Sequence, residues 1–153
     1  MKHKRLHWQP DAEVAENARR VLPKMAQDYF RAGRKASRKK TTPEKLHQFR
    51  LRTKHFRYLL EFFAPLYGKR LTRPLTSLRR LQTLLGELND YAVTRRMMQA
   101  EPDATQLMAH LDQLESTRRQ EFRTYWRESF DADGERERWR NLLQAPGRIS
   151  PKG

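Results

Sequence analysis

Residues 42–68 read TPEKLHQFRLRTKHFRYLLEFFAPLYG, and this stretch decides how the chain folds. Thr42 is a favourable N-cap, and Pro43 suits the first helical position because its missing N–H would have no partner there. The helix is predicted to run to Tyr67, with Pro65 bending its last turn, after which Gly68 supplies a C-terminal stop. These capping and stop residues therefore predict one long helix with a defined beginning and end.

Hydrophobic residues recur along this helix at spacings of three and four, which predicts a buried seam. A polar line lies about 110° round the helix from that seam. A second apolar stripe lies beyond the polar line, so the charges stand between two apolar stripes, and Arg52 lies on the remaining face. The buried seam is Phe49, Thr53, Phe56, Leu60, Phe63 and Tyr67; the polar line is His47, Arg50, Lys54 and Arg57; the second stripe is Leu51, Tyr58 and Phe62.

The polar line has two interpretations from its geometry alone. It spans about 15 Å of helix, and three permanent charges plus an imidazole suit a linear anion with repeating phosphates. Basic side chains beside a helical core also snorkel, with their stems over apolar surface and their heads in water. Arg57 has an ion-pair partner four residues on, in Glu61. The helical wheel leaves both interpretations open.

Further amphipathic helices are predicted on both sides of this stretch. Val14 and Leu107 are expected to be the first buried residues of the hydrophobic stripes in two of these helices. Pro23 is expected to kink or break the first helix, and the basic, apolar-poor residues 31–40 are expected to form a loop. The expected segments are Asp11 to about Gly33, Pro74 to about Ala100, Asp103 to about Phe130, and a short helix from Glu135 to Gln144.

These patterns predict an all-α fold, an antiparallel bundle of four long helices plus a short C-terminal helix. We expect one domain over residues 1–144. The tail over residues 145–153, with two prolines and two glycines, is expected to be disordered.

Charge is the dominant feature of the composition. The chain has 33 Lys plus Arg against 18 Asp plus Glu, a formal net charge of +15. Residues 1–60 carry +12, residues 61–100 carry +4, and residues 101–153 carry −1. Such a field attracts nucleic acid, polyphosphate or an anionic membrane surface, and the first two thirds of the chain should bind it.

The chain contains no cysteine, which excludes disulfides and thiol chemistry. No apolar run approaches the ~20 residues needed to cross a bilayer. No apolar stretch of signal-peptide length follows the basic N-terminus. We therefore expect a cytoplasmic protein without a membrane span.

The helix expected at residues 74–100 carries a second polar line. Its amide side chains lie close to the apolar stripe, where they need hydrogen-bond partners. Gly86 in mid-helix costs about 1 kcal/mol relative to alanine, so we expect a packing reason there, such as the close approach of a neighbouring helix. Asn89 and Asp90 are expected to hold arginine or lysine side chains. The line consists of Arg79, Gln82, Gly86, Asn89 and Val93.

Two sequence blocks resemble the CHAD domain, the conserved histidine α-helical domain. In the first, HQFRLRTKHFRY at residues 47–58, histidine is followed by arginine at +3, lysine at +7 and arginine at +10, then tyrosine. The second is LQTLLGELND at residues 81–90, which is similar to the family's pattern leucine-Gln-x-x-leucine-Gly-x-x-Asn-Asp. The resemblance covers roughly residues 44–96.

The resemblance implies a helical fold with a basic groove that binds inorganic polyphosphate, without catalysis and without a cofactor. It favours the binding interpretation of the polar line. The implied anion-facing residues are His47, Arg50, Lys54 and Arg57, with Arg79 and Arg80; Gln82, Asn89 and Asp90 order or pack them, and Arg52 and Tyr58 support the site.

Family members typically carry two such bundles in one chain, whereas this sequence has one clear histidine-arginine block. His110 is followed by acidic and apolar residues instead of the basic spacing. A homodimer would bring two basic stripes to one groove. Docking on polyphosphate granules is compatible with the same interpretation.

Other functions fit the residues less well. His3 and His7 have helical spacing but no nearby carboxylate, and the positive field disfavours metal ions. Phosphoryl transfer needs an acidic metal-binding cluster or a glycine-rich phosphate loop with lysine, and the sequence has neither. Non-specific DNA or RNA binding stays the alternative. The tryptophans do not interleave with the polar line as base-stacking platforms would; they are Trp8, Trp126 and Trp139.

Overall fold

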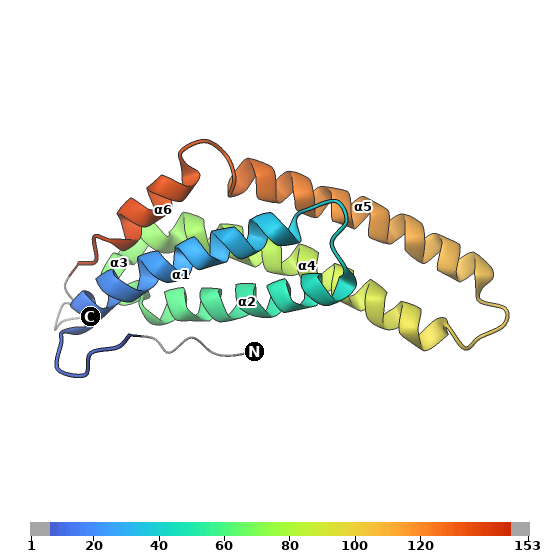
Figure 1. Cartoon of the computed structure of the whole chain (residues 1–153), viewed down its shortest axis with the longest axis horizontal. Coiled ribbons are helices and arrows are strands. Elements are labelled where there is room, and N and C mark those ends of the chain that lie inside the picture. The colour runs from blue at the N-terminus through green and yellow to red at the C-terminus, as the bar shows by residue number, and fades with distance from the viewer. Residues whose placement is uncertain (1–6, 148–153) are drawn as a thin grey trace.

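The structure is a computed structural model that describes residues 7–147. These residues are helical apart from short connections, and four long helices run alternately up and down (Figure 1). This arrangement confirms the predicted all-α antiparallel bundle with a short C-terminal helix. The long helices are α1 (Val14–Ala36), α2 (Pro43–Phe62), α4 (Thr72–Met98) and α5 (Thr105–Ser129); the short elements are α3 (Ala64–Tyr67), the 3₁₀ turn η1 (Gly68–Leu71) and α6 (Glu135–Leu143).

Helix α2 begins where the sequence predicts but ends earlier. The Thr42 hydroxyl accepts a hydrogen bond from the Lys45 backbone N–H at 3.2 Å. The helix ends at Phe62, so the prediction of a single helix to Tyr67 is wrong. Pro65 explains the break, because it has no N–H to donate to the carbonyl four residues earlier.

Helix α1 is longer than the sequence predicts. A loop is expected over residues 31–40, but the helix continues to Ala36, and Pro23 does not break it. The reason lies at Gly33, where an added Cβ would be 2.0 Å from a ring carbon of Trp126 in α5. The glycine lets the indole lie directly on the α1 backbone, and this contact anchors the last turns of α1.

Two predicted core positions are exposed. Val14 is 40% exposed and Leu107 is 39% exposed. Each stands in the first turn of its helix, at opposite ends of the bundle (Figure 1). The hydrophobic stripes therefore begin one or two turns further into α1 and α5.

An aromatic cluster fills the core between α1, α2, α5 and α6. Tyr29 has its ring centroid 5.2 Å from that of Phe49 and 4.8 Å from that of Phe56. Its hydroxyl lies 2.8 Å from the Thr53 hydroxyl, which donates to the Phe49 carbonyl at 2.9 Å. Burial raises the pKa of Tyr29. Because these contacts hold one side of α2 against α1, the polar line of α2 turns toward α4.

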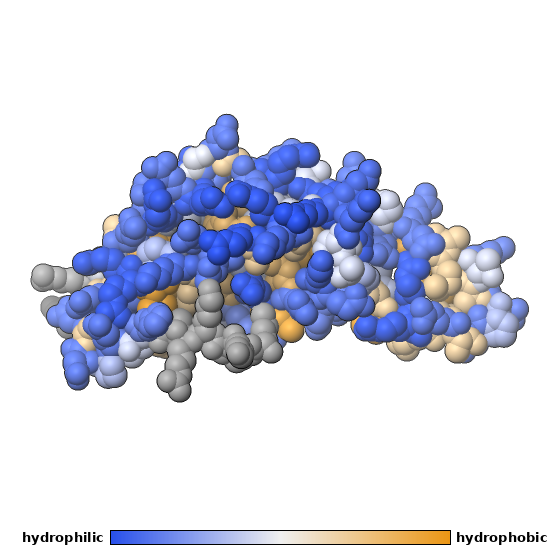
Figure 2. All heavy atoms as spheres, viewed as in Figure 1, coloured by the Kyte–Doolittle hydropathy of each residue, from blue (hydrophilic) through white to orange (hydrophobic). Residues whose placement is uncertain are grey.

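Polar side chains cover most of the face seen in Figure 2. No helix among residues 7–147 is long and apolar enough to cross a bilayer. The described start of the predicted tail contacts the body, because the Gly147 N–H donates to the Leu66 carbonyl at 2.6 Å. The rest of that tail, residues 148–153, lies outside the described residues, as do residues 1–6.

Candidate polyanion-binding site

Helices α2 and α4 lie side by side, and side chains of their two polar lines meet. We call this contact the α2/α4 seam. It combines permanent cations, one imidazole, two neutral amides and one carboxylate. Its members are His47, Arg50, Lys54, Arg57 and Glu61 from α2, and Arg79, Gln82, Gly86 and Asn89 from α4.

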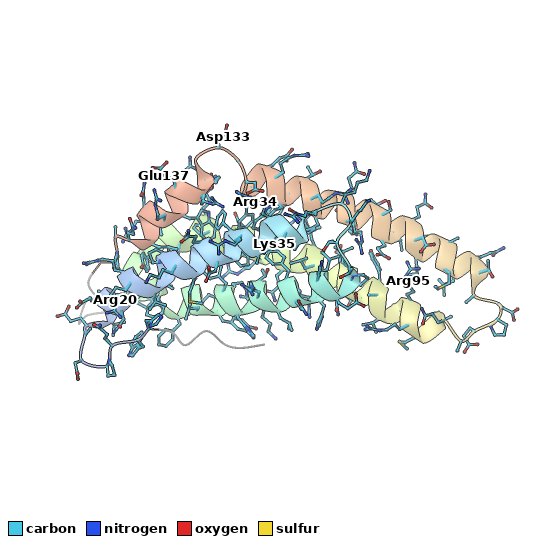
Figure 3. The ribbon with its side chains drawn as sticks, viewed as in Figure 1. Arg20, Arg34, Lys35, Arg95, Asp133 and Glu137 are labelled. Carbon is cyan, nitrogen blue, oxygen red and sulfur yellow. The ribbon has the colours of Figure 1, made fainter. Side chains whose placement is uncertain are left out.

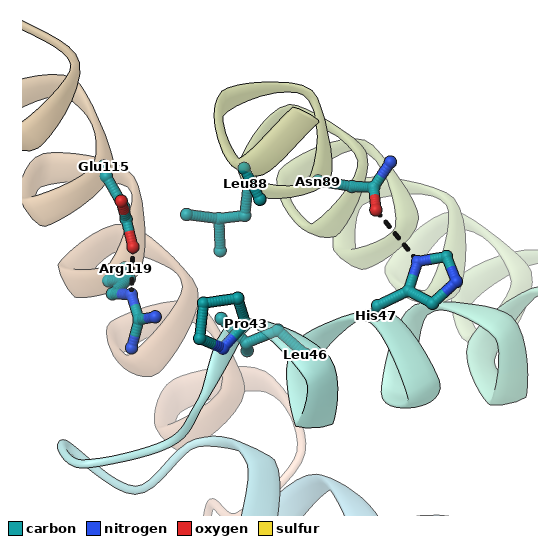
Figure 4. A pocket seen from close by; sticks show the side chains of 8 residues that line it. Pro43, Leu46, His47, Leu88, Asn89, Glu115 and Arg119 are labelled. Carbon is teal, nitrogen blue, oxygen red and sulfur yellow. Dashed lines mark hydrogen bonds and ion pairs between the residues drawn. The ribbon is translucent and has the colours of Figure 1, made fainter. Parts of the chain in front are cut away.

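His47 is positioned by Asn89 across the seam. The ring Nδ1 lies 2.8 Å from the amide Oδ1 (Figure 4). An amide oxygen only accepts, so Nδ1 carries the proton in this arrangement and Nε2 stays available to a ligand. The partner is neutral, and it therefore orients the ring without cancelling the charge of a protonated imidazole.

A small cavity lies beside this pair, where α2, α4 and α5 meet. Its volume is about 10 Å³, which is the lower limit for one water molecule and far too small for a phosphate. The Glu115–Arg119 ion pair of α5 lines its opposite wall (Figure 4). A ligand at His47 must therefore approach along the outer surface of the seam.

Arg57 is the most constrained cation of the seam. Its side chain is 15% exposed, and its Nε donates to Gln82 Oε1 at 2.8 Å. Its Nη1 donates to Glu61 Oε1 at 2.6 Å, so the i,i+4 pair that the sequence left open is present. The guanidinium carbon also lies 4.6 Å from the ring centroid of Tyr58, within cation–π range. Arg79 reaches the same Glu61 oxygen from α4 at 3.2 Å.

Arg50 faces Gly86 near the middle of the seam. Its Nε is buried and has no hydrogen-bond partner among the described residues. A Cβ at Gly86 would lie 3.9 Å from this Nε, an ordinary van der Waals distance, and no backbone comes within 4 Å. The expected close approach of a neighbouring helix at Gly86 is therefore wrong. The glycine that permits such an approach is the one in α1, against the α5 indole.

Lys54 stands between Arg50 and Arg57 along α2. Its Nζ lies 5.8 Å from the Tyr58 ring centroid. Neither Lys54 nor Arg50 forms an ion pair within residues 7–147. Two of the four permanent cations of the seam are thus free of a carboxylate.

The other predicted site residues lie at the margins. Arg52 and Arg80 are exposed, and Tyr58 is exposed beside the cations. Asp90 is also exposed, and its carboxylate pairs with no cation in the described part of the chain. The structure thus brings Asn89 and Gln82 to seam cations, as predicted for ordering groups, whereas it leaves Asp90 apart from them.

No group of three or more His, Cys, Asp or Glu side chains among the described residues is arranged to hold a metal ion. His3, which the sequence pairs with His7, lies outside the described residues. A depression of about 300 Å³ runs along α5 beside His110 and Arg118. Arg118 is already paired with Glu87 and Glu121, so this depression offers no free cation.

The family model of the CHAD domain matches residues 2–99. The chain belongs to the CHAD domain family. The match includes both sequence blocks and the whole α2/α4 seam. CHAD domains are associated with polyphosphate binding and are generally binding domains. No curated protein and no solved structure matched the chain.

The sequence does not predict the role of Glu61 at the seam of this CHAD domain. The spacing of Arg57 and Glu61 signals their pairing, but the sequence does not indicate that Arg79 joins the same carboxylate. That contact depends on the relative height of α2 and α4, which no local pattern encodes. It makes Glu61 the one acidic side chain among residues 7–147 that links two seam cations.

Proposed function

We propose that this CHAD domain binds inorganic polyphosphate along the α2/α4 seam and performs no catalysis. The observation that carries the proposal is which groups hold the seam cations, and how few of those groups are carboxylates. His47 and Arg57 are oriented by neutral amides, and Arg50 and Lys54 have no carboxylate partner among the described residues. Positive charge is therefore fixed along the line, and among the described residues only Glu61 pairs with part of it.

The seam suits a chain of phosphates because its cations are spaced along a line. From His47 to Arg57 the helix rises about 15 Å, enough for several successive phosphate units. Arg50 and Arg57 offer planar donors for bidentate phosphate bonding, and Lys54 offers a mobile point charge. Arg79 and Arg80 extend the line on α4, with Arg52 and Tyr58 at its edge.

We further propose that two copies associate so that two seams line one groove. This arrangement would double the charge that a single polyphosphate chain meets. Light scattering with and without polyphosphate tests it, and a monomer at micromolar concentration under both conditions would contradict it. Residence in the cytoplasm and association with polyphosphate granules belong to the same proposal.

A competition titration tests the function. Labelled long-chain polyphosphate is displaced by duplex DNA, transfer RNA or tripolyphosphate at about 0.15 M salt. We expect polyphosphate to persist against a large charge excess of nucleic acid, since the fixed cations match a narrow, densely charged chain. Displacement in proportion to charge alone would instead make nucleic acid the leading partner.

A further inference from the structure

Glu61 holds an unusual position at the seam. One of its carboxylate oxygens, Oε1, lies 2.6 Å from Arg57 Nη1 and 3.2 Å from Arg79 Nη2. The two guanidiniums come from different helices and converge on a single oxygen. Two arginines that share one anionic oxygen form the arrangement that binds a phosphate oxygen.

The guanidinium of Arg57 would keep its place without Glu61. Its Nε is bonded to Gln82 Oε1 at 2.8 Å, and its flank lies over the Tyr58 ring. Arginine has five N–H donors, and these contacts with Glu61 and Gln82 use two of them. The neutral amide and the aromatic ring therefore suffice to orient the group.

Glu61 itself has a route away from the two arginines. Its side chain is 32% exposed, and it hydrogen-bonds no described side chain other than these two. A rotation about its own side-chain bonds would carry the carboxylate into solvent. An incoming phosphate would favour that rotation, because two anions on the same guanidiniums repel each other.

We propose that Glu61 is an internal counter-anion, which occupies a phosphate position between Arg57 and Arg79 and is displaced when polyphosphate binds. This inference rests on the proposed function and adds a specificity-determining residue to it. An isolated orthophosphate must replace the carboxylate with little else to gain. A chain of phosphates offsets the displacement through its contacts with Arg50 and Lys54, so Glu61 selects for chains.

The test compares Glu61→Gln with wild type in binding tripolyphosphate and long-chain polyphosphate. Glutamine keeps an oxygen that can accept from both arginines, but it removes the competing charge. We expect E61Q to bind about two- to fivefold more tightly, the range for a partly exposed charge pair. The matched control is Glu137→Gln on α6 (Figure 3), which raises net charge equally and removes an exposed pair with Arg140 at 3.7 Å.

Circular dichroism and thermal unfolding confirm that the variants are folded, and Glu61→Ala serves as a second variant if E61Q is not. Tighter binding by E61Q but not by E137Q supports the proposal. Equal or weaker binding by E61Q overturns it and makes Glu61 a positioning residue for Arg57. An equal gain in both variants also overturns it, because net charge alone would explain the change. If wild type and variants all fail to bind polyphosphate, the proposed function itself fails.

Discussion

Helix α4 meets α2 on one side and α5 on the other, and the arginines at the two contacts have different partners. At the α5 contact Arg95 and Arg118 pair with carboxylates across the two helices; Arg95, for example, reaches from α4 to Asp112 and Glu115 of α5 (Figure 3). At the seam, two of the four permanent cations, Arg57 and Arg79, share the carboxylate of Glu61, and the other two pair with no described carboxylate. The α5 pairs are Arg95 with Asp112 at 2.5 Å and Glu115 at 2.8 Å, Arg118 with Glu87 at 2.5 Å and Glu121 at 2.8 Å, and Arg119 with Glu115 at 3.0 Å.

An arginine's partners decide what it does at each contact. Hydrogen bonding to Asp112 raises the pKa of Arg95, and bonding to Glu121 raises that of Arg118. Those cations are neutralised in pairs and cross-link two helices. Of the seam cations, Arg50 and Lys54 pair with no described carboxylate, and Arg57 and Arg79 share only Glu61. More of the charge at the seam therefore stays available. The sequence shows the same division, since residues 101–153 are nearly neutral and residues 1–60 carry +12.

The largest effect is expected when the glycine of the seam is compared with Gly33, which lies in α1 against α5. Gly33→Ala would drive a Cβ into the Trp126 ring and destabilise the fold by about 3 kcal/mol. Gly86→Ala meets only the Arg50 side chain at 3.9 Å, so improved helix propensity should stabilise the fold by up to about 1 kcal/mol. Urea unfolding of both variants measures the contrast. Similar losses in both would show that α4 also needs its glycine for packing.

Charge reversal at the seam should separate binding from folding. The double variant Arg50→Glu and Arg57→Glu replaces two phosphate-facing cations by anions. Each lost charged contact is worth about 1.5–3 kcal/mol, so we expect polyphosphate affinity to fall by roughly 100-fold or more. Fluorescence anisotropy measures the affinity, and circular dichroism should show retained helicity. A folded variant that still binds would place the site elsewhere.

The matched reversal at the α5 contact, Arg95→Glu with Arg118→Glu, lowers the net charge by the same amount. It should destabilise the fold, because it places like charges beside Asp112, Glu115 and Glu87. Thermal unfolding is expected several degrees lower, while polyphosphate affinity changes little. Equal loss of affinity in both double variants would mean that net charge governs binding, and the distinction between the two contacts would not hold.

The smallest effect is expected from the side chain of His47. His47→Gln removes the ring that Asn89 orients at the seam. We expect polyphosphate affinity to fall roughly two- to threefold, the scale of one weak hydrogen bond. His55→Gln, on the exposed face of the same helix, should leave the affinity unchanged, and fluorescence anisotropy measures both variants. Equal affinity of the two variants would contradict a role for His47 at the site.

Local sequence signals predict the elements well where a cap or a periodic stripe marks them. Thr42 caps α2 as predicted, and the apolar core stripe of α2 from Phe49 to Leu60 is buried. The errors occur where a tertiary contact overrides local preference. Residues 31–36 stay helical because Trp126 packs on Gly33, and nothing near Gly33 in the sequence indicates that partner.

In the candidate site, too, local patterns predict some features and tertiary packing decides the others. Periodicity places His47, Arg50, Lys54 and Arg57 on one line, and the two sequence blocks indicate that Gln82 and Asn89 accompany them. Which amide meets which cation depends on how far α4 is shifted along α2. That shift is set by packing of the whole bundle, so the shared oxygen of Glu61 emerges only in three dimensions.

The neutral amides at the seam also have an evolutionary consequence. A glutamine codon becomes a glutamate codon, and an asparagine codon an aspartate codon, through one nucleotide change. At Gln82 or Asn89 the new carboxylate would keep the hydrogen bond to Arg57 or His47, and the helices would pack as before. It would also neutralise the cation that it holds. Descendants of this chain can therefore weaken anion binding in a single mutational step and keep an intact scaffold for another role.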